Sequence, residues 1–346
     1  MTEGGFRLPA EWSPQSGVLI AWPHEETDWG PRLADVEQTY VALARAIAAR
    51  QRLAICVAND ALRLHASGLL AAAGCSMDRV EFVEVDYDDT WLRDTGPISL
   101  RGAGGWRLLD LHFTGWGGKF GASRDDRIVQ RCVEAGLFSA ACTHQREDFA
   151  LEGGAIESDG AGTLMSTWAC LQQRHPDVSR ESLRQRMAEL FGSTRVEVLE
   201  HGYLQGDDTD AHIDTLARFA PDGVIVHQAC DDPADVHFEP LQRMAEELAA
   251  LRSAQDSPYR LMPLPWPRPV LDDGRRLAAS YANYLIINGA VLMPAYGDPA
   301  DERAAAVLAA AHPGREIVPV PCRSLIWQNG SLHCITMQLP EGVLHG

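Results

Sequence analysis

The sequence lacks the features that would place the protein in a membrane or on a nucleic acid. No apolar run approaches the roughly 18 residues of a membrane span, and the first seven residues, MTEGGFR, hold no apolar core of signal-peptide length. No basic stripe of the kind that binds phosphates is present, and 48 acidic residues against 30 basic ones give a formal charge of −18. We therefore expect a cytoplasmic protein without a membrane or nucleic-acid partner, whose negative field attracts small cations.

Metal-binding signatures are missing as well. The eight cysteines stand singly, with no C-x-x-C pair and no metal-like spacing to histidine, and no H-E-x-x-H string occurs. We expect no metal and no other cofactor, and most cysteines should be small buried hydrophobes. A catalytic cysteine can only be recognised by its neighbours.

No Ser/Gly/Pro-rich linker divides the chain, so a single domain over residues 1–346 is expected. A recurring alternation of strand and helix patterns predicts an α/β fold. Helices are predicted over 31–50, 61–73, 125–135, 179–191, 233–251 and 299–311. Strands are predicted over 17–22, 52–57, 80–86 and 106–111, and near residues 155, 163, 196, 212, 224, 260, 284, 291, 317 and 334.

Four short strings, far apart in the chain, carry groups suited to the chemistry of a guanidinium ion. They are WLRDTGP at 91–97, LEGG at 151–154, HID at 212–214 and HCIT at 333–336. A planar cation with N–H donors on two edges is best held by two carboxylates, which Asp94 and Asp214 could supply. The central carbon is a poor electrophile, so displacement of ammonia is easiest through a covalent adduct with a soft nucleophile such as Cys334. His212 would then move the protons.

The local patterns give these residues a geometry and also a plain structural alternative. His212 and Asp214 are two apart in an expected strand, which would send both side chains to one face, although such a pair can be a surface feature. Cys334 lies in a half-alternating strand pattern, where a core cysteine would be unremarkable. Glu152 precedes two glycines; it could fix the ring of His212 or be a simple turn residue.

Aromatic residues accompany the strings. Trp91 and Trp116 could wall a pocket and stack on the cation, and their structural alternative is a place in the core.

Together the strings resemble the agmatine deiminase family, relatives of the bacterial peptidyl-arginine deiminases in the guanidino-group-modifying pentein superfamily. The resemblance covers nearly the whole chain, and ordered matches are more specific than any single one. It rests on LPAEW at 8–12, AWPH at 21–24, WLRDTGP at 91–97, FTGWGGKF at 113–120, LEGG at 151–154, residues 206–214 and HCIT at 333–336.

The resemblance implies a pentein catalytic domain over the whole chain, a five-bladed α/β propeller with pseudo-fivefold symmetry and a central active site. It implies that Cys334 is the nucleophile, His212 the general acid and base, and Glu152 the partner of His212. Asp94 and Asp214 would be the guanidinium clamp.

The resemblance also bears on the substrate and on the assembly. Asp208 matches an acidic position near the distal amine of agmatine, and the family suggests a homodimer. The chain departs from the family at Ala211, where glycine is usual, and at WQNGSL in 327–332, where a glycine-rich run is usual. These departures bear on the pocket shape and therefore on the substrate.

Agmatine is the expected substrate, with water and agmatine giving N-carbamoylputrescine and ammonia. Free arginine is less suited because its carboxylate would face Asp207, Asp208 and Asp210. Peptidyl arginine or another guanidine stays open, as does an amidinotransferase of the same superfamily. A metal-dependent hydrolase and a non-catalytic polyamine-binding protein are the remaining alternatives.

Overall fold

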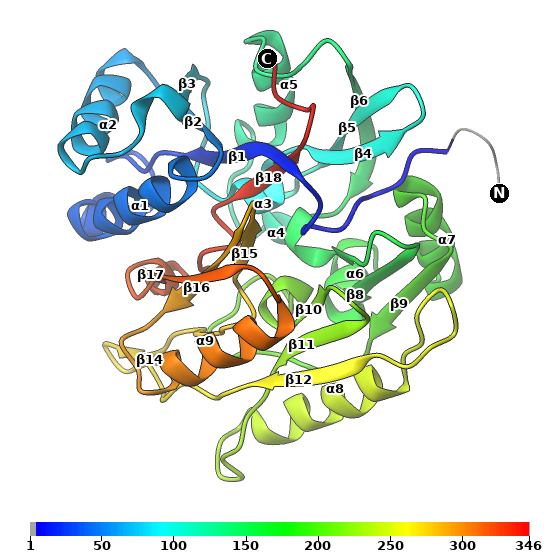
Figure 1. Ribbon diagram of the computed structural model, residues 1–346. Coiled ribbons are helices and arrows are strands. Elements are labelled where there is room, and N and C mark those ends of the chain that lie inside the picture. The colour runs from blue at the N-terminus through cyan, green and yellow to red at the C-terminus, as the bar shows by residue number, and fades with distance from the viewer. Residues whose placement is uncertain (1–4, 346) are drawn as a thin grey trace.

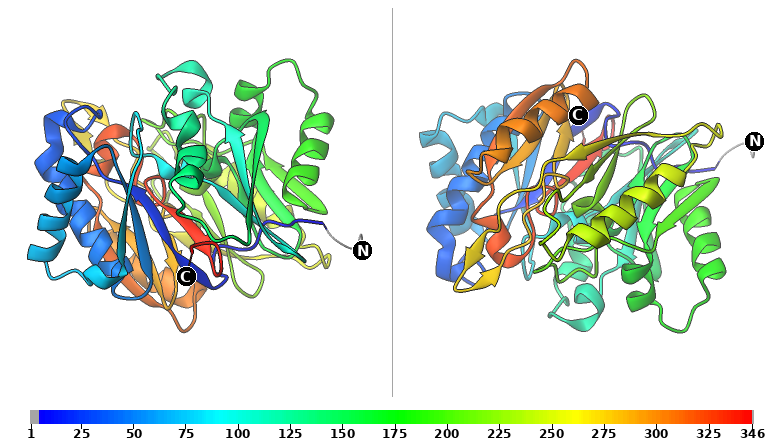
Figure 2. Two further views of the ribbon diagram at one scale, coloured as in Figure 1. Left: turned by 90° about the horizontal axis from the view of Figure 1, so that it is seen from above. Right: turned by 90° about the horizontal axis from the view of Figure 1, so that it is seen from below.

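The computed structural model describes residues 5–345 and has a mixed α/β architecture (Figure 1). Residues 1–4 lie outside the described residues, and they belong to the N-terminal stretch in which the sequence predicts no signal peptide. Within residues 5–345 the strands form five sheets of three or four strands and one two-stranded hairpin. In both views of Figure 2 the helices lie around the outside of the strands.

Four of the sheets repeat one arrangement. The middle strand pairs antiparallel with the strand before it and parallel with the strand that follows the next helix or helices. The sheets are β4 (Ile98–Gly102), β5 (Gly105–His112) and β6 (Cys142–Ala150); β7 (Glu157–Ser158), β8 (Thr163–Thr167) and β9 (Arg195–Leu199); β10 (Ala217–Ala220), β11 (Val224–Gln228) and β12 (Arg260–Leu264); and β15 (Leu285–Ile287), β16 (Ala290–Ala295) and β17 (Glu316–Pro321).

The remaining large sheet joins the two ends of the chain. It consists of β18 (Met337–Pro340), β1 (Gln15–Ala21), β2 (Arg52–Val57) and β3 (Val80–Glu84). β1 pairs antiparallel with β18 and parallel with β2, which repeats the arrangement of the other sheets with strands from opposite ends of the sequence (Figure 1). The hairpin is β13 (Leu271–Asp272) with β14 (Arg275–Arg276). No sheet among the described residues closes on itself.

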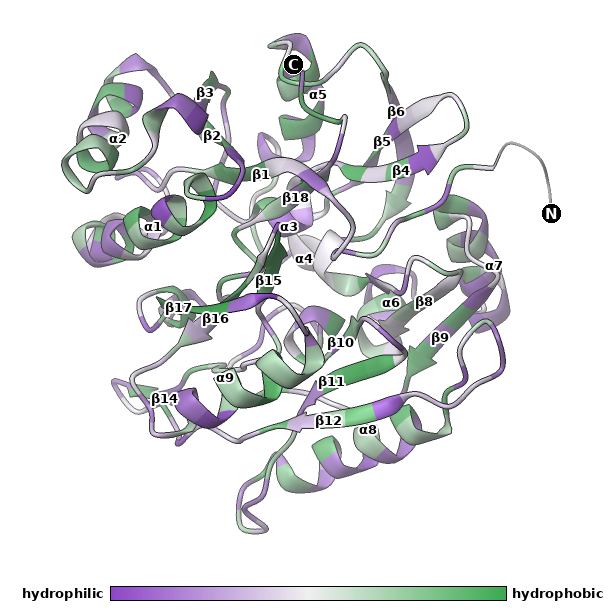
Figure 3. Cartoon of the chain, in the orientation of Figure 1, coloured by the Kyte–Doolittle hydropathy of each residue, from purple (hydrophilic) through white to green (hydrophobic). Residues whose placement is uncertain are grey.

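The longer helices connect the parallel strands and bury one apolar stripe each. α1 (Leu33–Ala48), for example, buries Val36, Tyr40, Leu43 and Ile47 at three- and four-residue spacing. The other helices are α2 (Asp60–Ala72), α3 (Leu92–Thr95), α4 (Gly115–Gly118), α5 (Ile128–Glu134), α6 (Trp168–Arg174), α7 (Arg180–Phe191), α8 (Phe238–Ala250) and α9 (Ala300–Ala311). Figure 3 shows the inner strands β11 and β15 in hydrophobic colours, whereas the outer helices α7 and α8 alternate between hydrophobic and hydrophilic colours. No helix in the described part of the chain is long and apolar enough to cross a membrane.

The predicted helices are all present, the one expected from residue 233 beginning only at Phe238. The α/β class is confirmed, and most predicted strands lie within a few residues of their expected positions. The elements that were not predicted are the strands β4, β6, β7, β10, β13, β14 and β18 and the short helices α3, α4 and α6. The strand β6 was not predicted because its sequence, CTHQREDFA, is mostly polar and half exposed and shows no clear apolar pattern.

Three predicted strands are wrong, and all three lie at the centre of the molecule. Residues 153–155 and 213–215 form 3₁₀ turns, and the segment around Cys334 is a series of turns that ends before β18. In the second segment Asp210 and Ala211 adopt positive φ angles of 67° and 64°, which strand geometry excludes. The backbone N–H groups of these segments are satisfied by side chains and turns instead of a strand ladder.

Candidate active site

Asp94 lies in α3 and is buried beside two fixed donors. The indole Nε1 of Trp116 donates to Asp94 Oδ2 at 2.9 Å, and the backbone N–H of Gly154 donates to Oδ1 at 2.9 Å. Burial raises the pKa of Asp94 to about 6, and the neighbouring His212 only partly offsets this. Trp116 itself has φ 54° and ψ 48°, a left-handed conformation that aims its ring at the carboxylate.

His212 lies between two carboxylates. Its Nδ1 is 3.7 Å from Asp94 Oδ1, and its Nε2 is 3.3 Å from Glu152 Oε2. Burial acts to lower the pKa of His212, but Asp94, Cys170 and Glu152 together raise it well above its usual value. His212 is therefore a proton donor in the ligand-free site.

Glu152 is fully buried and is held on its other side by Arg174, whose Nε donates to Oε1 at 2.7 Å. Burial alone would raise the pKa of Glu152, but His212 and Arg174 lower it, so the carboxyl stays ionised. Gly154 is the second of the two glycines that follow Glu152, and the close packing at this position requires it. A Cβ there would lie 2.7 Å from both Asp94 Oδ1 and His212 Nδ1, so only glycine lets these groups approach.

Asp214 reaches the same centre from the 3₁₀ turn after His212, not from the strand face that the sequence predicted. The ring Nδ1 of His333 is 2.8 Å from Asp214 Oδ2. The other oxygen, Oδ1, is buried and has no protein partner. Burial opposes ionisation, but His333 and more distant cations lower the pKa of Asp214.

Cys334 is buried beside Asp214 and Asn283. Its Sγ is 3.7 Å from Asp214 Oδ2, and the amide Nδ2 of Asn283 donates to Sγ at 3.2 Å. Burial, followed by the charges of Asp214 and Asp94, raises the pKa of the thiol well above its usual value. A cation bound between these carboxylates would offset the two charges and favour the thiolate.

The site opens into a cavity of about 760 Å³. Cys334, Asp94, Trp91 and Trp116 line its buried end. Its exposed end is lined by further acidic and aromatic residues, Asp28, Asp88, Asp89, Asp125, Asp208, Asp272, Asp273, Phe120 and Trp327, with Arg275 as the one Arg or Lys among the lining residues described.

Two carboxyl groups of this cavity have raised pKa values, so a bound cation would favour their ionised forms. The carboxyl of Asp208 accepts from Asn329 Nδ2 at 2.8 Å, and burial raises its pKa. Burial also raises the pKa of Asp89 to about 7, with Asp28 and Asp125 adding repulsion. The cavity wall therefore favours cationic ligands.

The structure brings all the predicted site residues to this one place. Cys334, Asp94, Trp91, Trp116 and Asp208 line the cavity, and Glu152, His212 and Asp214 lie buried directly behind them.

Sequence reasoning gave no role to several residues of the site. Arg174 and Asn283 stand outside the four strings, and a buried partner in a distant element leaves no local signal. Glu11 and His333 stand inside recognised strings without an assigned role.

One group of side chains could hold a metal ion. Single ligand atoms of Glu152, Cys170 and His212 lie within 4.8 Å of one another. The guanidinium of Arg174 on Glu152 opposes a second positive charge at that position.

A thiol, an imidazole and three carboxylates lie together at an acidic cavity, an arrangement suited to a small planar cation. The chain belongs to the Porphyromonas-type peptidyl-arginine deiminase family, whose model matches residues 7–340. It is thus a hydrolase that acts on the C–N bonds of linear amidines.

Relatives in this family resemble the chain over nearly its full length. An agmatine deiminase of Stutzerimonas stutzeri is 33% identical, over 98% of this chain and 96% of that protein. A crystal structure from Porphyromonas gingivalis, provisionally named an arginine deiminase, is 43% identical with a TM-score of 0.92, covering 98% of this chain and 99% of that one. A cysteine-to-serine variant of the C. jejuni agmatine deiminase with substrate bound is 32% identical with a TM-score of 0.90, covering 99% and 98%.

Proposed function

We propose that the protein hydrolyses agmatine to N-carbamoylputrescine and ammonia through a covalent adduct on Cys334. The observation that carries the proposal is the pair of buried carboxylates beside the thiol. Asp214 keeps one oxygen without a protein partner, and Asp94 is oriented by Trp116 and Gly154. A guanidinium supplies the N–H donors and the positive charge that this arrangement lacks.

The proposed first half-reaction forms the adduct. The guanidinium binds between Asp94 and Asp214, and its charge favours the thiolate of Cys334, whose proton passes to solvent through the cavity. The sulfur attacks the central carbon, and protonated His212 gives its proton to a terminal nitrogen, which leaves as ammonia. An S-alkylthiouronium on Cys334 remains.

In the second half-reaction His212, now neutral, takes a proton from water. The resulting hydroxide attacks the thiouronium carbon, the C–S bond breaks to release the thiolate, and the hydroxyl proton passes to solvent as the ureido product forms. Glu152, held by Arg174, keeps the ring of His212 oriented through both halves.

Agmatine is favoured by the charge of the cavity. The primary amine at the far end of agmatine would lie near Asp208, and Trp91 and Trp116 would flank the guanidinium. The carboxylate of free arginine would be repelled by the same wall. Names of relatives support this choice, since the chain is similar to agmatine deiminases over nearly its whole length.

Peptidyl arginine is a second candidate, because the cavity of about 760 Å³ is larger than agmatine requires. An amidinotransferase of the same superfamily is a third candidate, in which an amine replaces water in the second half-reaction. Product analysis with and without an added amine separates the transferase from the hydrolase.

The decisive test is ammonia release from agmatine, arginine and a short arginine peptide. Wild-type protein should release ammonia fastest from agmatine, and Cys334→Ala should lower the rate by roughly a thousandfold or more. Cys230→Ala, at a partly exposed cysteine away from the cavity, is the matched control. Equal background release by wild type and Cys334→Ala on all three compounds would defeat the proposal.

The proposal extends to the whole molecule. The five sheets of like topology are consistent with a five-bladed α/β propeller with pseudo-fivefold symmetry, formed as a single catalytic domain over residues 1–346. The cytoplasmic location expected from the sequence and the homodimer suggested by the family stay predictions, which cell fractionation and light scattering would test.

A further inference from the structure

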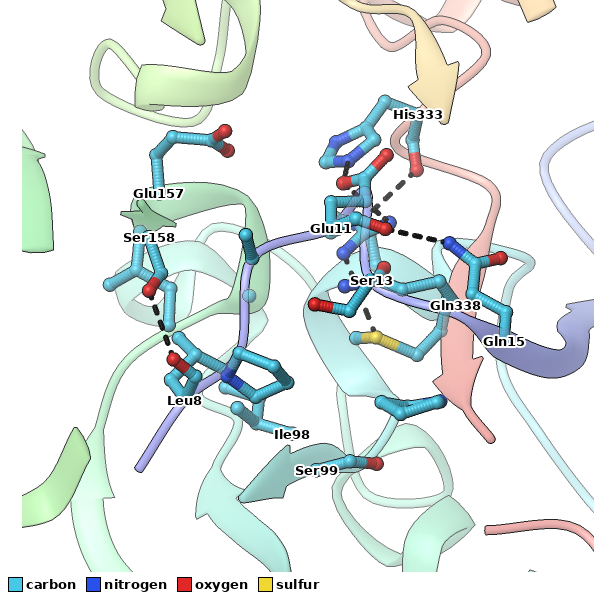
Figure 4. Close-up of a pocket in the computed structure, with 17 residues that line it drawn as sticks. Leu8, Glu11, Ser13, Gln15, Ile98, Ser99, Glu157, Ser158, His333 and Gln338 are labelled. Carbon is cyan, nitrogen blue, oxygen red and sulfur yellow. Dashed lines mark hydrogen bonds and ion pairs between the residues drawn. The ribbon is translucent and has the colours of Figure 1, made fainter. Parts of the chain in front are cut away.

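Asp214 is the first of a row of three buried ionisable side chains, and His333 and Glu11, from two distant segments, follow behind it. His333 Nδ1 is 2.8 Å from Asp214 Oδ2, and His333 Nε2 is 2.8 Å from Glu11 Oε2. Each of the three residues is at most 7% exposed. Figure 4 shows Glu11 facing His333 beside a second cavity, of about 40 Å³, that both residues line.

Glu11 is the fixed end of the row. Arg218 Nη2 donates to Glu11 Oε2 at 2.7 Å, and the backbone N–H of Ile286 donates to Oε1 at 2.7 Å. Burial opposes ionisation, but Arg218 and His333 hold the pKa of Glu11 far below its usual value. Glu11 is therefore a carboxylate, an acceptor only, and it requires a hydrogen on Nε2 of His333.

The other ring nitrogen faces a second carboxylate. Asp214 Oδ2 also accepts only, so the 2.8 Å contact requires a hydrogen on Nδ1 as well. An imidazolium satisfies both contacts at once. Its positive charge then lies between two carboxylates, which stabilises the ionised form of the buried Asp214.

The contact with His333 also fixes the orientation of the Asp214 carboxylate. With Oδ2 bound to His333, the plane of the carboxylate is fixed, and Oδ1 is left buried without a protein partner. In the proposed clamp, Oδ1 is the atom that would accept from the guanidinium. Asp94, by contrast, accepts its hydrogen bonds from two neutral donors, Trp116 and Gly154, and His212 Nδ1 is 3.7 Å away.

We propose that Glu11 and His333 are positioning residues that hold Asp214 ionised and oriented, with Oδ1 free for the guanidinium of the substrate. This inference rests on the proposed function and names two residues that act on the substrate only through Asp214. Glu11 does so from the N-terminal segment, 322 residues before His333 in the sequence.

Glu157 offers a matched control for Glu11. Its side chain is 5% exposed, as is the side chain of Glu11, and it binds the same arginine, with Arg218 Nε donating to Glu157 Oε2 at 2.8 Å. Hydrogen bonds in the described structure connect it to Arg218 and Phe219 and not to His333. Both Glu11→Gln and Glu157→Gln remove a carboxyl group that binds Arg218, although burial raises the pKa of Glu157 to about 7, and only Glu11→Gln removes the anion that faces Nε2 of His333.

The test compares the steady-state kinetics of both variants with agmatine. Glu11→Gln should raise KM roughly tenfold or more, with a smaller change in kcat, because a charge-assisted hydrogen bond on Asp214 becomes a neutral one. It should also make the acid limb of the kcat/KM profile steeper, because Asp214 then ionises less readily and its protonation adds to that of Asp94. Glu157→Gln should keep the wild-type KM and acid limb.

The proposal is overturned if Glu11→Gln keeps the wild-type KM and acid limb, or if Glu157→Gln changes both to the same extent. Should Glu11→Gln fail to fold, the pair His333→Asn and His333→Gln replaces it. The amide nitrogen of Asn lies near the position of Nδ1 and can still donate to Asp214, whereas that of Gln lies near Nε2 and cannot. Agmatine should bind His333→Asn at least tenfold tighter than His333→Gln, and equal affinity would overturn the proposal.

The two proposals fail in different ways. A wild-type protein that releases no ammonia from any guanidino compound tested would defeat the proposed function. A fully active wild type whose Glu11→Gln and Glu157→Gln variants behave alike would defeat this inference alone.

Discussion

The two ends of the large cavity use carboxylates in opposite ways. At the buried end Asp214 is ionised by a charged neighbour, and Asp94 is oriented by fixed donors. Toward the exposed end Asp89 and Asp125, which are themselves largely buried, lie close together, and burial raises the pKa of each to about 7. The buried end thus specifies where a planar cation binds, whereas the exposed end supplies a negative field without fixing an orientation.

The largest effect should follow from breaking the buried end. Asp214→Asn removes the acceptor that a guanidinium requires, and its amide would place a donor against His333 or the substrate. We expect kcat/KM for agmatine to fall by roughly a hundredfold or more. Asp273→Asn, an equal change at the exposed end, should lower it less than about threefold. Similar losses in both variants would remove the distinction between the two ends.

The pH dependence tests the same end without a mutation. Because burial raises the pKa of Asp94 to about 6, a proton occupies this carboxyl below that pH and the clamp is incomplete. We expect kcat/KM to rise roughly tenfold per pH unit up to about pH 6 and then to level off. In Asp94→Asn the residual activity should lack this limb; an unchanged limb would assign it to another group.

Asp89→Asn sharpens the picture of the exposed end. Losing one charge of the field should raise KM for agmatine about twofold to fivefold at low ionic strength, and the difference should shrink at high salt. Binding that is insensitive to both the substitution and salt would argue against a role for the field.

The same variant should be more stable than wild type at neutral pH. Asp89 binds a proton more readily in the folded than in the unfolded chain, so its ionisation costs stability as pH rises from about 4 to about 7. Removing it should raise the free energy of unfolding by up to about 4 kcal/mol above pH 7, which corresponds to the roughly three pKa units between folded and unfolded chain, and by nothing below pH 4. Urea denaturation at pH 4 and pH 8 measures this, and a gain at both values would contradict the assignment.

The smallest effect concerns the backbone beside His212. Ala211 has φ 64°, where an L-residue other than glycine is strained. Ala211→Gly should therefore raise the free energy of unfolding by about 0.5–1 kcal/mol with kcat unchanged. Ala217→Gly in β10, where the backbone is extended, should be destabilising instead. Thermal unfolding of the two variants distinguishes strain relief from a general effect of glycine.

Ala211, which departs from the family pattern, shows how much of the local backbone structure could be predicted from the sequence. A glycine was expected from the resemblance, and the structure supplies the reason, since the position has a positive φ. The sequence also indicated the helices well, because an apolar stripe such as that of α1 is a local property. It misplaced the strands at His212 and Cys334, because short apolar runs with a polar residue read alike as strand and as buried turn.

What the sequence by itself determined is the set of candidate groups for the site, namely the thiol of Cys334, the imidazole of His212 and the carboxyls of Asp94, Glu152 and Asp214, together with the alternation of helices and strands. Side-chain chemistry and periodicity are local, and they can be read without coordinates. Only the tertiary structure decided which carboxyl is held charged, which is left with a free oxygen, and that Arg174, Asn283, His333 and Glu11 stand behind them. Those properties come from burial and from partners many residues away, and no local pattern encodes them.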